Sequence, residues 1–190
     1  MQALGRLMPE NVEIERRFLV DGRFERPWVH ESTTCIEIKQ WYLDHKKFSV
    51  SIEHNKVMYK NKQLVSGLSE EVCSTLLQEP DWTVRIRKSH SAYLLTLKGS
   101  RKGASAAEFE WEIERNTAES VVDDLLYPFV EKKRYLWTNT DGFVWEIDEF
   151  ESNLAGLIIA EVELEDEDVT VEIPSLSLIH ISEPTRHCTI

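Results

Sequence analysis

The 190-residue sequence lacks several features on which common protein classes depend. Its three cysteines, Cys35, Cys73 and Cys188, are far apart and odd in number. This argues against a disulfide framework and favours a reducing compartment. No apolar run approaches the length that spans a bilayer, and residues 1–11, interpreted as an N-terminal leader, lack a signal-peptide pattern. We therefore expect a cytoplasmic protein without membrane attachment.

Several motifs of phosphate, metal and nucleophilic chemistry are also missing. The glycines of the segment KGSRKG (98–103) do not have the spacing of a phosphate-binding loop, so phosphate would have to be bound by side chains. The six histidines show no metal-ligand spacing, and no Cys-x-x-Cys occurs. No serine stands in a Gly-x-Ser-x-Gly context, so a nucleophile triad is unsupported.

Positive charge is in deficit, with 22 Lys and Arg against 34 Asp and Glu, which gives a formal net charge of −12. A strongly acidic surface repels nucleic acid at long range, so we expect no nucleic-acid partner. A small anionic substrate remains compatible with this charge, because local basic groups and a metal ion reverse the sign of the field inside a cavity.

Alternation of apolar and polar residues with period two is the dominant pattern, and it predicts strands. Ser69 is the expected N-cap of a short helix that ends at Gln78, and Thr117 that of a helix reaching about Val130, whose last turn Pro128 should disturb. A hairpin is expected near 60–62. The predicted strands are 12–20, 35–43, 82–88, 92–99, 108–114, 132–138, 143–150 and 157–164. So many strands with so few helices favour a barrel or a curved antiparallel sheet.

Charged residues share one face of these strands and sort by sign from strand to strand. One strand carries the pair Arg85 and Arg87, whereas another carries Glu161 and Glu163. For any single strand, the charged face could simply be the solvent-exposed face of a sheet. The opposite faces are bulky and apolar, however, and must be buried against helices or a partner. Closing the sheet would place the charges in a polar lumen, where acidic strands hold hard cations and basic strands hold phosphate oxygens. Carboxylate-only clusters suit Mg²⁺ or Mn²⁺.

An ordered series of motifs over residues 12–174 resembles the CYTH family, the triphosphate tunnel metalloenzymes. The family's Glu-x-Glu-x-Lys motif reads EIERR at 13–17 here. The further motifs are QWYL (40–43), TVRIR (83–87), AYLLTLKG (92–99), EFEWEI (108–113), EKKRYLW (131–137), GFVWEIDEF (142–150) and LAGLIIAEVEL (154–164). The resemblance implies an α+β, mainly β fold: an eight-stranded antiparallel β-barrel with helices packed outside. Residues 44–81 would be an insertion in this single domain.

The resemblance also implies site residues. The principal metal ligands would be Glu13, Glu15, Glu161 and Glu163, and further candidates are Glu110, Glu146 and Asp148. The triphosphate would be held by Arg17, Lys39, Arg85, Arg87, Lys98, Lys132 and Arg134. Catalysis would rest on Glu13, Glu15, Arg17, Glu161 and Glu163. Arg17 stands where the family has lysine, and because arginine has no accessible neutral form this argues against a proton-shuttling role.

The function implied by the resemblance is hydrolysis of inorganic triphosphate with Mg²⁺ or Mn²⁺. Two other reactions of the family stay open, adenylate cyclisation and thiamine-triphosphate hydrolysis, although nothing reads as a purine or thiazolium pocket. A polyphosphate-binding module without turnover stays open because of Arg17. The family often dimerises, so a homodimer is also an option.

The end of the chain breaks the strand pattern. The segment SLIHISEPTRH (177–187) resembles translated library-adapter sequence. We therefore expect residues 175–190 to be a non-native tail without a structural role.

Overall fold

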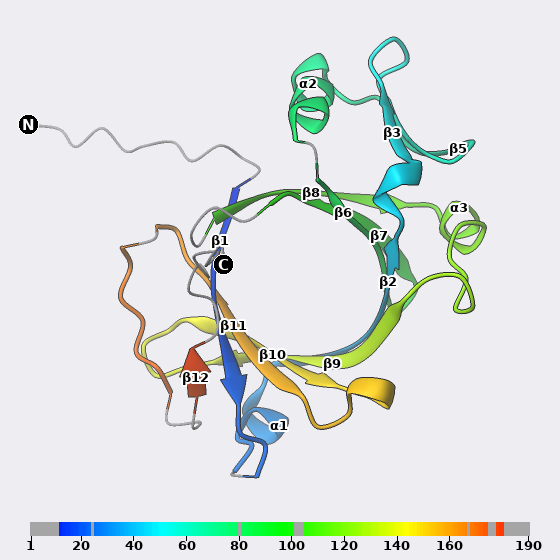
Figure 1. The fold of residues 1–190 in the computed structure, drawn as a ribbon. Helices are drawn as coiled ribbons and strands as arrows, with labels where there is room; N and C mark the ends of the chain where they lie inside the picture. Colours follow the sequence, from blue (N-terminus) through cyan, green and yellow to red (C-terminus); the bar gives the residue numbers. More distant parts are fainter. Residues whose placement is uncertain are drawn as a thin grey trace, which may run out of the picture.

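A closed barrel of antiparallel strands is the main feature of the fold. The structure, a computed structural model, describes residues 12–23, 25–79, 81–100, 105–166, 168–174 and 178–180. Its largest sheet has nine strands in the order β11-β10-β9-β2-β6-β7-β8-β1-β12. Strand β1 (Val12–Val20) also pairs with β11 (Ile158–Glu163), which closes eight of these strands into a ring. Figure 1 looks along the axis of this ring.

The predicted eight-stranded antiparallel barrel is confirmed, with strand ends that differ from the predicted ones by a few residues. The other wall strands are β2 (Thr34–Leu43), β6 (Thr83–Ser89), β7 (Ala92–Lys98), β8 (Ser105–Ile113), β9 (Phe129–Thr138) and β10 (Val144–Phe150). The turn η2 (Ser152–Leu154) precedes β11. The short strand β12 (Leu178–His180) pairs with the end of β1, contrary to the expectation that the tail has no structural role.

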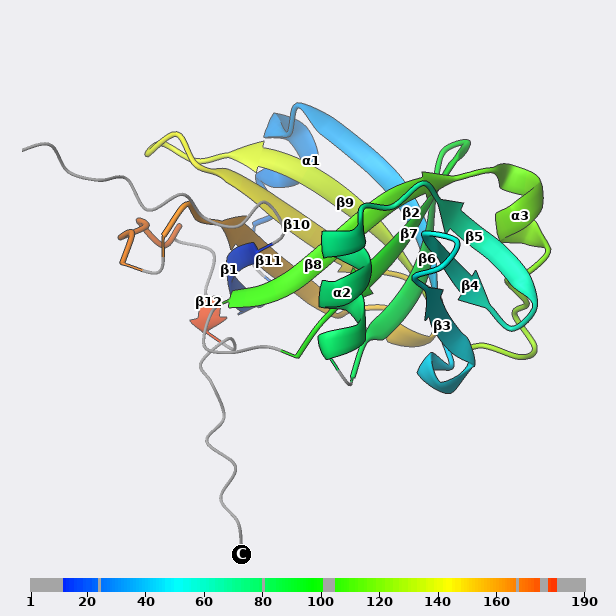
Figure 2. The same cartoon turned by 90° about the horizontal axis from the view of Figure 1, so that it is seen from above.

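Residues 44–81 form a layer outside the barrel. They comprise η1 (His45–Lys47), the three-stranded sheet of β3 (Phe48–Ser51), β4 (Lys56–Tyr59) and β5 (Lys62–Ser66), and helix α2 (Glu70–Gln78). The hairpin and the helix were both predicted, and Ser69 caps α2 by accepting a hydrogen bond from the Val72 amide. In Figure 2 this layer lies against the outer face of β6, β7 and β8.

The apolar core lies outside the barrel wall rather than within it. One cluster fills the space between the wall and the outer layer and includes Leu76 and Leu95. The other includes Trp145 of β10 and Trp28 of α1 (Trp28–Glu31), and both indoles are fully buried. Because strand side chains alternate, covering the apolar faces from outside turns the charged faces inward. The interpretation of the charged faces as a lumen lining is therefore correct.

The helix predicted from Thr117 to Val130 is wrong over most of its length, because it overlaps the observed helix only at residues 117–119. Helix α3 spans only Arg115–Glu119, and a chain of turns follows it. The Asp123 side chain accepts a hydrogen bond from the Leu125 amide at 2.8 Å, a local bond that competes with helical bonding. The apolar residues of this segment are accordingly divided between core and surface, since Val121 is buried while Leu125 is 95% exposed.

Helix α2 offers a test of the outer layer with a neighbouring control. Leu76 is 2% exposed, whereas its neighbour Leu77 is 52% exposed. Replacing Leu76 with alanine should lower the free energy of unfolding by about 2–3 kcal/mol through lost contacts and a cavity. Leu77→Ala should change it by less than about 0.5 kcal/mol. Urea titration of both variants measures the difference, and equal values would contradict the packing described.

None of the helices in the described part of the chain is long and apolar enough to cross a membrane.

Candidate active site

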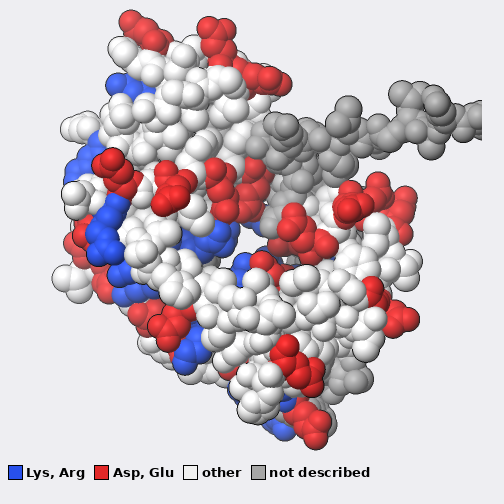
Figure 3. Space-filling view, turned by 180° about the vertical axis from the view of Figure 1, so that it is seen from behind, with Lys and Arg blue, Asp and Glu red and all other residues white. Residues whose placement is uncertain are grey.

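A charged tunnel runs through the barrel. Its cavity measures about 510 Å³, and thirteen of the seventeen lining residues are ionisable acids or bases. Figure 3 shows a hollow in the molecule bordered by both basic and acidic side chains. The acidic lining residues are Glu15, Glu108, Glu110, Glu146, Asp148, Glu161 and Glu163, and the basic ones are Arg17, Arg85, Arg87, Lys98, Lys132 and Arg134. The remaining four are Gln40, Tyr42, Phe150 and Ile159.

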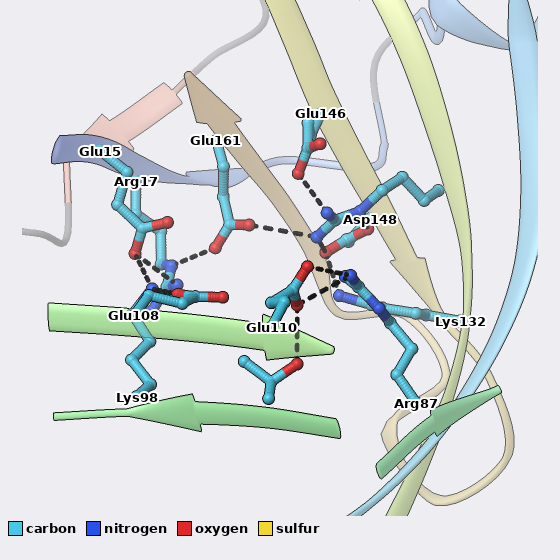
Figure 4. A network of polar contacts seen from close by, with 12 residues as sticks. Glu15, Arg17, Arg87, Lys98, Glu108, Glu110, Lys132, Glu146, Asp148 and Glu161 are labelled. Carbon is cyan, nitrogen blue, oxygen red and sulfur yellow. Dashed lines mark hydrogen bonds and ion pairs between the residues drawn. The ribbon is translucent and has the colours of Figure 1, made fainter. Parts of the chain in front are cut away.

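Side chains of β1 and β11 form one side of the tunnel. Arg17 lies between two carboxylates, with its Nε donating to Glu161 Oε1 at 2.5 Å and its Nη2 donating to Glu15 Oε1 at 2.9 Å (Figure 4). Lys98 of β7 donates to the same Glu15 oxygen at 3.4 Å. Glu15 is 5% exposed, so its charge depends on these partners rather than on water.

Asp148 forms ion pairs with two bases of β9, Lys132 and Arg134. Its Oδ1 accepts from Arg134 Nε and its Oδ2 from Arg134 Nη2, both at 2.7 Å, and Lys132 also donates to Oδ2. Burial alone would raise the pKa of the Asp148 carboxyl, but the hydrogen bonds and charges of these two bases outweigh it, and the pKa lies below its usual value. Arg134 also pairs with Glu146, whose own pKa is raised by burial.

The bases of β6 are held in a similar way by acids of β8. Arg87 Nη2 is 3.0 Å from Glu110 Oε1, which also accepts a hydrogen bond from the Thr96 hydroxyl at 2.7 Å. Arg85 donates to Glu108 at 3.2 Å. The tunnel lining is therefore a network of ion pairs in which each described base has an acidic neighbour.

The structure contradicts the placement of Lys39 in the tunnel. Lys39 lies on the outer face of β2, where its Nζ is 2.6 Å from Asp124 Oδ2 and 4.1 Å from the centre of the Phe129 ring. Its neighbours Gln40 and Tyr42 face the tunnel instead. The family resemblance implied Lys39 as a phosphate ligand, but β2 turns this residue to the outer face of the barrel.

The other predicted site residues lie as follows. Glu163 is exposed and lines the tunnel, with its Cα opposite that of Glu15. Glu13 lies on β1 opposite Ala106, and its side chain is outside the described part. All other predicted residues line the tunnel. Sequence reasoning missed Glu108 and Gln40; the face that Glu108 shares with Glu110 was an available signal for the first.

The carboxylates of β1, β10 and β11 suit a hard divalent cation in donor type. Glu161 faces Glu146 across one strand pair and Arg17 across the other, so oxygen donors from three strands share one wall. Within the described residues, no three His, Cys, Asp or Glu side chains converge on one point, and Arg17 lies between the carboxylates. The donor set fits Mg²⁺ or Mn²⁺, and Arg17 would have to turn away from it.

Comparison with known proteins identifies the family of this tunnel. The sequence model of the CYTH domain matches residues 74–174. The chain is 35% identical over 130 residues to a protein of Acetivibrio thermocellus named inorganic triphosphatase, covering 68% of this chain and 78% of that protein. The chain belongs to the CYTH family. An inorganic triphosphatase of Nitrosomonas europaea is 35% identical over 85 residues, which cover 45% of this chain and 56% of that protein.

Solved CYTH-type structures share the fold. The crystal structure of the inorganic triphosphatase NE1496 matches 92% of this chain and 89% of its own, with a TM-score of 0.51 and 24% identity. A second structure of the same protein has a TM-score of 0.52 at 24% identity and covers 92% of this chain and 93% of its own. At this identity the likeness supports the barrel architecture alone.

Proposed function

We propose that this CYTH protein hydrolyses inorganic triphosphate in its tunnel with the help of Mg²⁺ or Mn²⁺. The observation that carries the proposal is the lining, in which bases from four strands, β1, β6, β7 and β9, face one cavity of about 510 Å³. The family and its relatives named inorganic triphosphatases support the same reaction. Closed walls on all sides suit a linear polyanion that is bound along its length.

The chain's own residues would bind the triphosphate and hold it in line. Arg85, Arg87, Lys98, Lys132 and Arg134, with Arg17, supply N–H donors to its oxygens, so the gain in rate comes from positioning and charge stabilisation. Glu15, Glu161 and Glu163, with Glu13, would hold the divalent cation, which supplies positive charge against the phosphate oxygens. The charge balance supports a cation: seven acids against six bases leave no excess positive charge for a polyanion.

The lining favours an inorganic substrate over a nucleotide or thiamine triphosphate. An organic group would need an apolar or aromatic wall, and among the described lining residues the only uncharged ones are Gln40, Tyr42, Phe150 and Ile159. Lys132 lies 5.6 Å from the centre of the Phe150 ring, so this ring already contacts a cation. A wall of this kind binds phosphate oxygens along the whole tunnel.

The test is a substrate panel with the full chain. Phosphate release from tripolyphosphate, ATP, thiamine triphosphate and long-chain polyphosphate is measured with Mg²⁺ and with Mn²⁺, and cyclic AMP is assayed in the ATP reaction. We expect tripolyphosphate to have the highest kcat/KM and no release in EDTA. Cyclic AMP formation would identify a cyclase, and metal-dependent binding of tripolyphosphate without release would identify a binding module.

Lys39 provides a control for the tunnel assignment. Because its side chain lies outside the barrel and pairs with Asp124, Lys39→Ala should change kcat/KM for tripolyphosphate by less than about threefold, which is the range of a surface ion pair. Lys132→Ala removes a tunnel base and should raise KM about tenfold or more. Steady-state kinetics of the two variants test whether Lys39 lies outside the tunnel. An equal loss of kcat/KM in both variants would indicate that Lys39 belongs to the site.

A further inference from the structure

Asp148 is the most buried acid of the tunnel, and its contacts set it apart from the other acids. It is 2% exposed, and both carboxylate oxygens are engaged by bases of β9. Arg134 presents its Nε and Nη2 edge to Asp148, each nitrogen at 2.7 Å, which is the two-point geometry that fixes a guanidinium plane. Lys132, 6% exposed, donates to the Oδ2 atom that also accepts from Nη2.

The two-point contact determines which edge of Arg134 faces the tunnel. Nε and Nη2 are turned to Asp148, so Nη1 and the second proton of Nη2 point to the acids of the lumen. Nη1 pairs with Glu146, and Nη2 is 3.3 Å from Glu161 Oε2 (Figure 4). That outward edge is the one that can bind a phosphate oxygen. Without Asp148, the guanidinium would be free to rotate among Glu146 and Glu161.

We propose that Asp148 is a positioning residue for substrate binding, which orients Arg134 and Lys132 toward the phosphate chain, and that it does not hold the metal. The proposal rests on the proposed function, because it concerns how the tunnel binds a polyphosphate. The oxygens of Asp148 are already occupied by two buried bases. Admitting a cation there would separate Lys132 from its ion-pair partner and would cost Arg134 its two-point contact.

The expected effect of Asp148→Asn on substrate and metal binding depends on the role of Asp148. The substitution removes one negative charge from the tunnel, so long-range electrostatics alone would tighten the binding of a polyanion. Loss of the two-point contact instead leaves Arg134 disordered and should raise KM for tripolyphosphate about tenfold, with a smaller change in kcat. A metal ligand would show itself in weaker Mn²⁺ binding.

The experiment is a double-mutant cycle with Asp148→Asn and Arg134→Met, measured by KM for tripolyphosphate with Mg²⁺ and by calorimetric titration with Mn²⁺ alone. We expect Asp148→Asn to raise KM in the wild-type background, to add less than about threefold in the Arg134→Met background, and to leave the Mn²⁺ affinity unchanged. Glu112→Gln, which changes an exposed acid outside the tunnel lining, serves as the matched control and should alter neither quantity.

Three results would overturn the proposal: tighter or unchanged tripolyphosphate binding in Asp148→Asn, full additivity with Arg134→Met, or a lower Mn²⁺ affinity. If Asp148→Asn does not fold, Asp148→Glu keeps the carboxylate but displaces it, and it should raise KM while leaving Mn²⁺ binding unchanged. Absence of tripolyphosphate turnover in the wild-type protein would count against the proposed function, whereas normal turnover with any of these results counts against the role of Asp148 alone.

Discussion

Glu161→Gln should lower kcat/KM for tripolyphosphate about 10²- to 10³-fold. Glu161 contacts bases of two strands: its Oε1 accepts from Arg17 of β1 at 2.5 Å, and its Oε2 lies 3.3 Å from Arg134 of β9. It also faces Glu146 across the β10–β11 pair. Glutamine keeps the size of the side chain but removes a charge that a divalent cation and two guanidiniums would share. The loss should therefore be larger than that of any single base.

Phosphate release with Mg²⁺ measures this effect, and calorimetric titration with Mn²⁺ separates its causes. A metal ligand loses Mn²⁺ affinity on neutralisation, whereas a residue that only positions Arg17 retains it. Thermal unfolding of the variant establishes that the barrel persists, and Glu112→Gln is again the matched control. Unchanged release by Glu161→Gln would contradict a catalytic role for Glu161.

The barrel itself was predictable because its pattern is strictly local. Period-two alternation in each strand separates apolar Phe18 from charged Arg17, and eight such strands with apolar outer faces leave little choice but a polar interior. The family resemblance, rather than this rule, placed Lys39 in the tunnel. Trp41 and Leu43 are buried on the outer face of β2, and parity with them would have put Lys39 outside.

The pairing of acids with bases was beyond the sequence, because it depends on register between strands that are distant along the chain. Glu110 of β8 reaches Arg87 of β6 across the intervening strand β7, and Thr96 completes that contact. Asp148 and Glu146 are two residues apart on one strand face, yet Asp148 is 2% exposed and holds two bases while Glu146 is only partly buried. The spacing of the two acids in the sequence does not distinguish them, whereas the burial of their side chains in the folded barrel does.

Arg17→Met should lower kcat/KM for tripolyphosphate about a hundredfold while strengthening Mn²⁺ binding. The guanidinium of Arg17 contacts Glu161 at 2.5 Å and Glu15 at 2.9 Å, so it occupies oxygens that a divalent cation would use. Removing it frees those carboxylates for the cation but takes away a donor to the phosphate chain. A single substitution should therefore move metal affinity and turnover in opposite directions, which loss of structure cannot do.

Arg17→Lys then shows what the arginine itself contributes. An ammonium has no planar fork and contacts the two carboxylates less well at once, so its Mn²⁺ affinity should lie between those of the wild type and Arg17→Met. Because lysine titrates and arginine does not, Arg17→Lys should lose more kcat at high pH than the wild type, whose tunnel already contains Lys132 with a pKa lowered by burial. Turnover that rises strongly in Arg17→Lys would mean that Arg17 restrains catalysis, and it would favour the binding-module alternative for the wild-type chain. Equal Mn²⁺ affinity in all three proteins would contradict the competition between Arg17 and the cation.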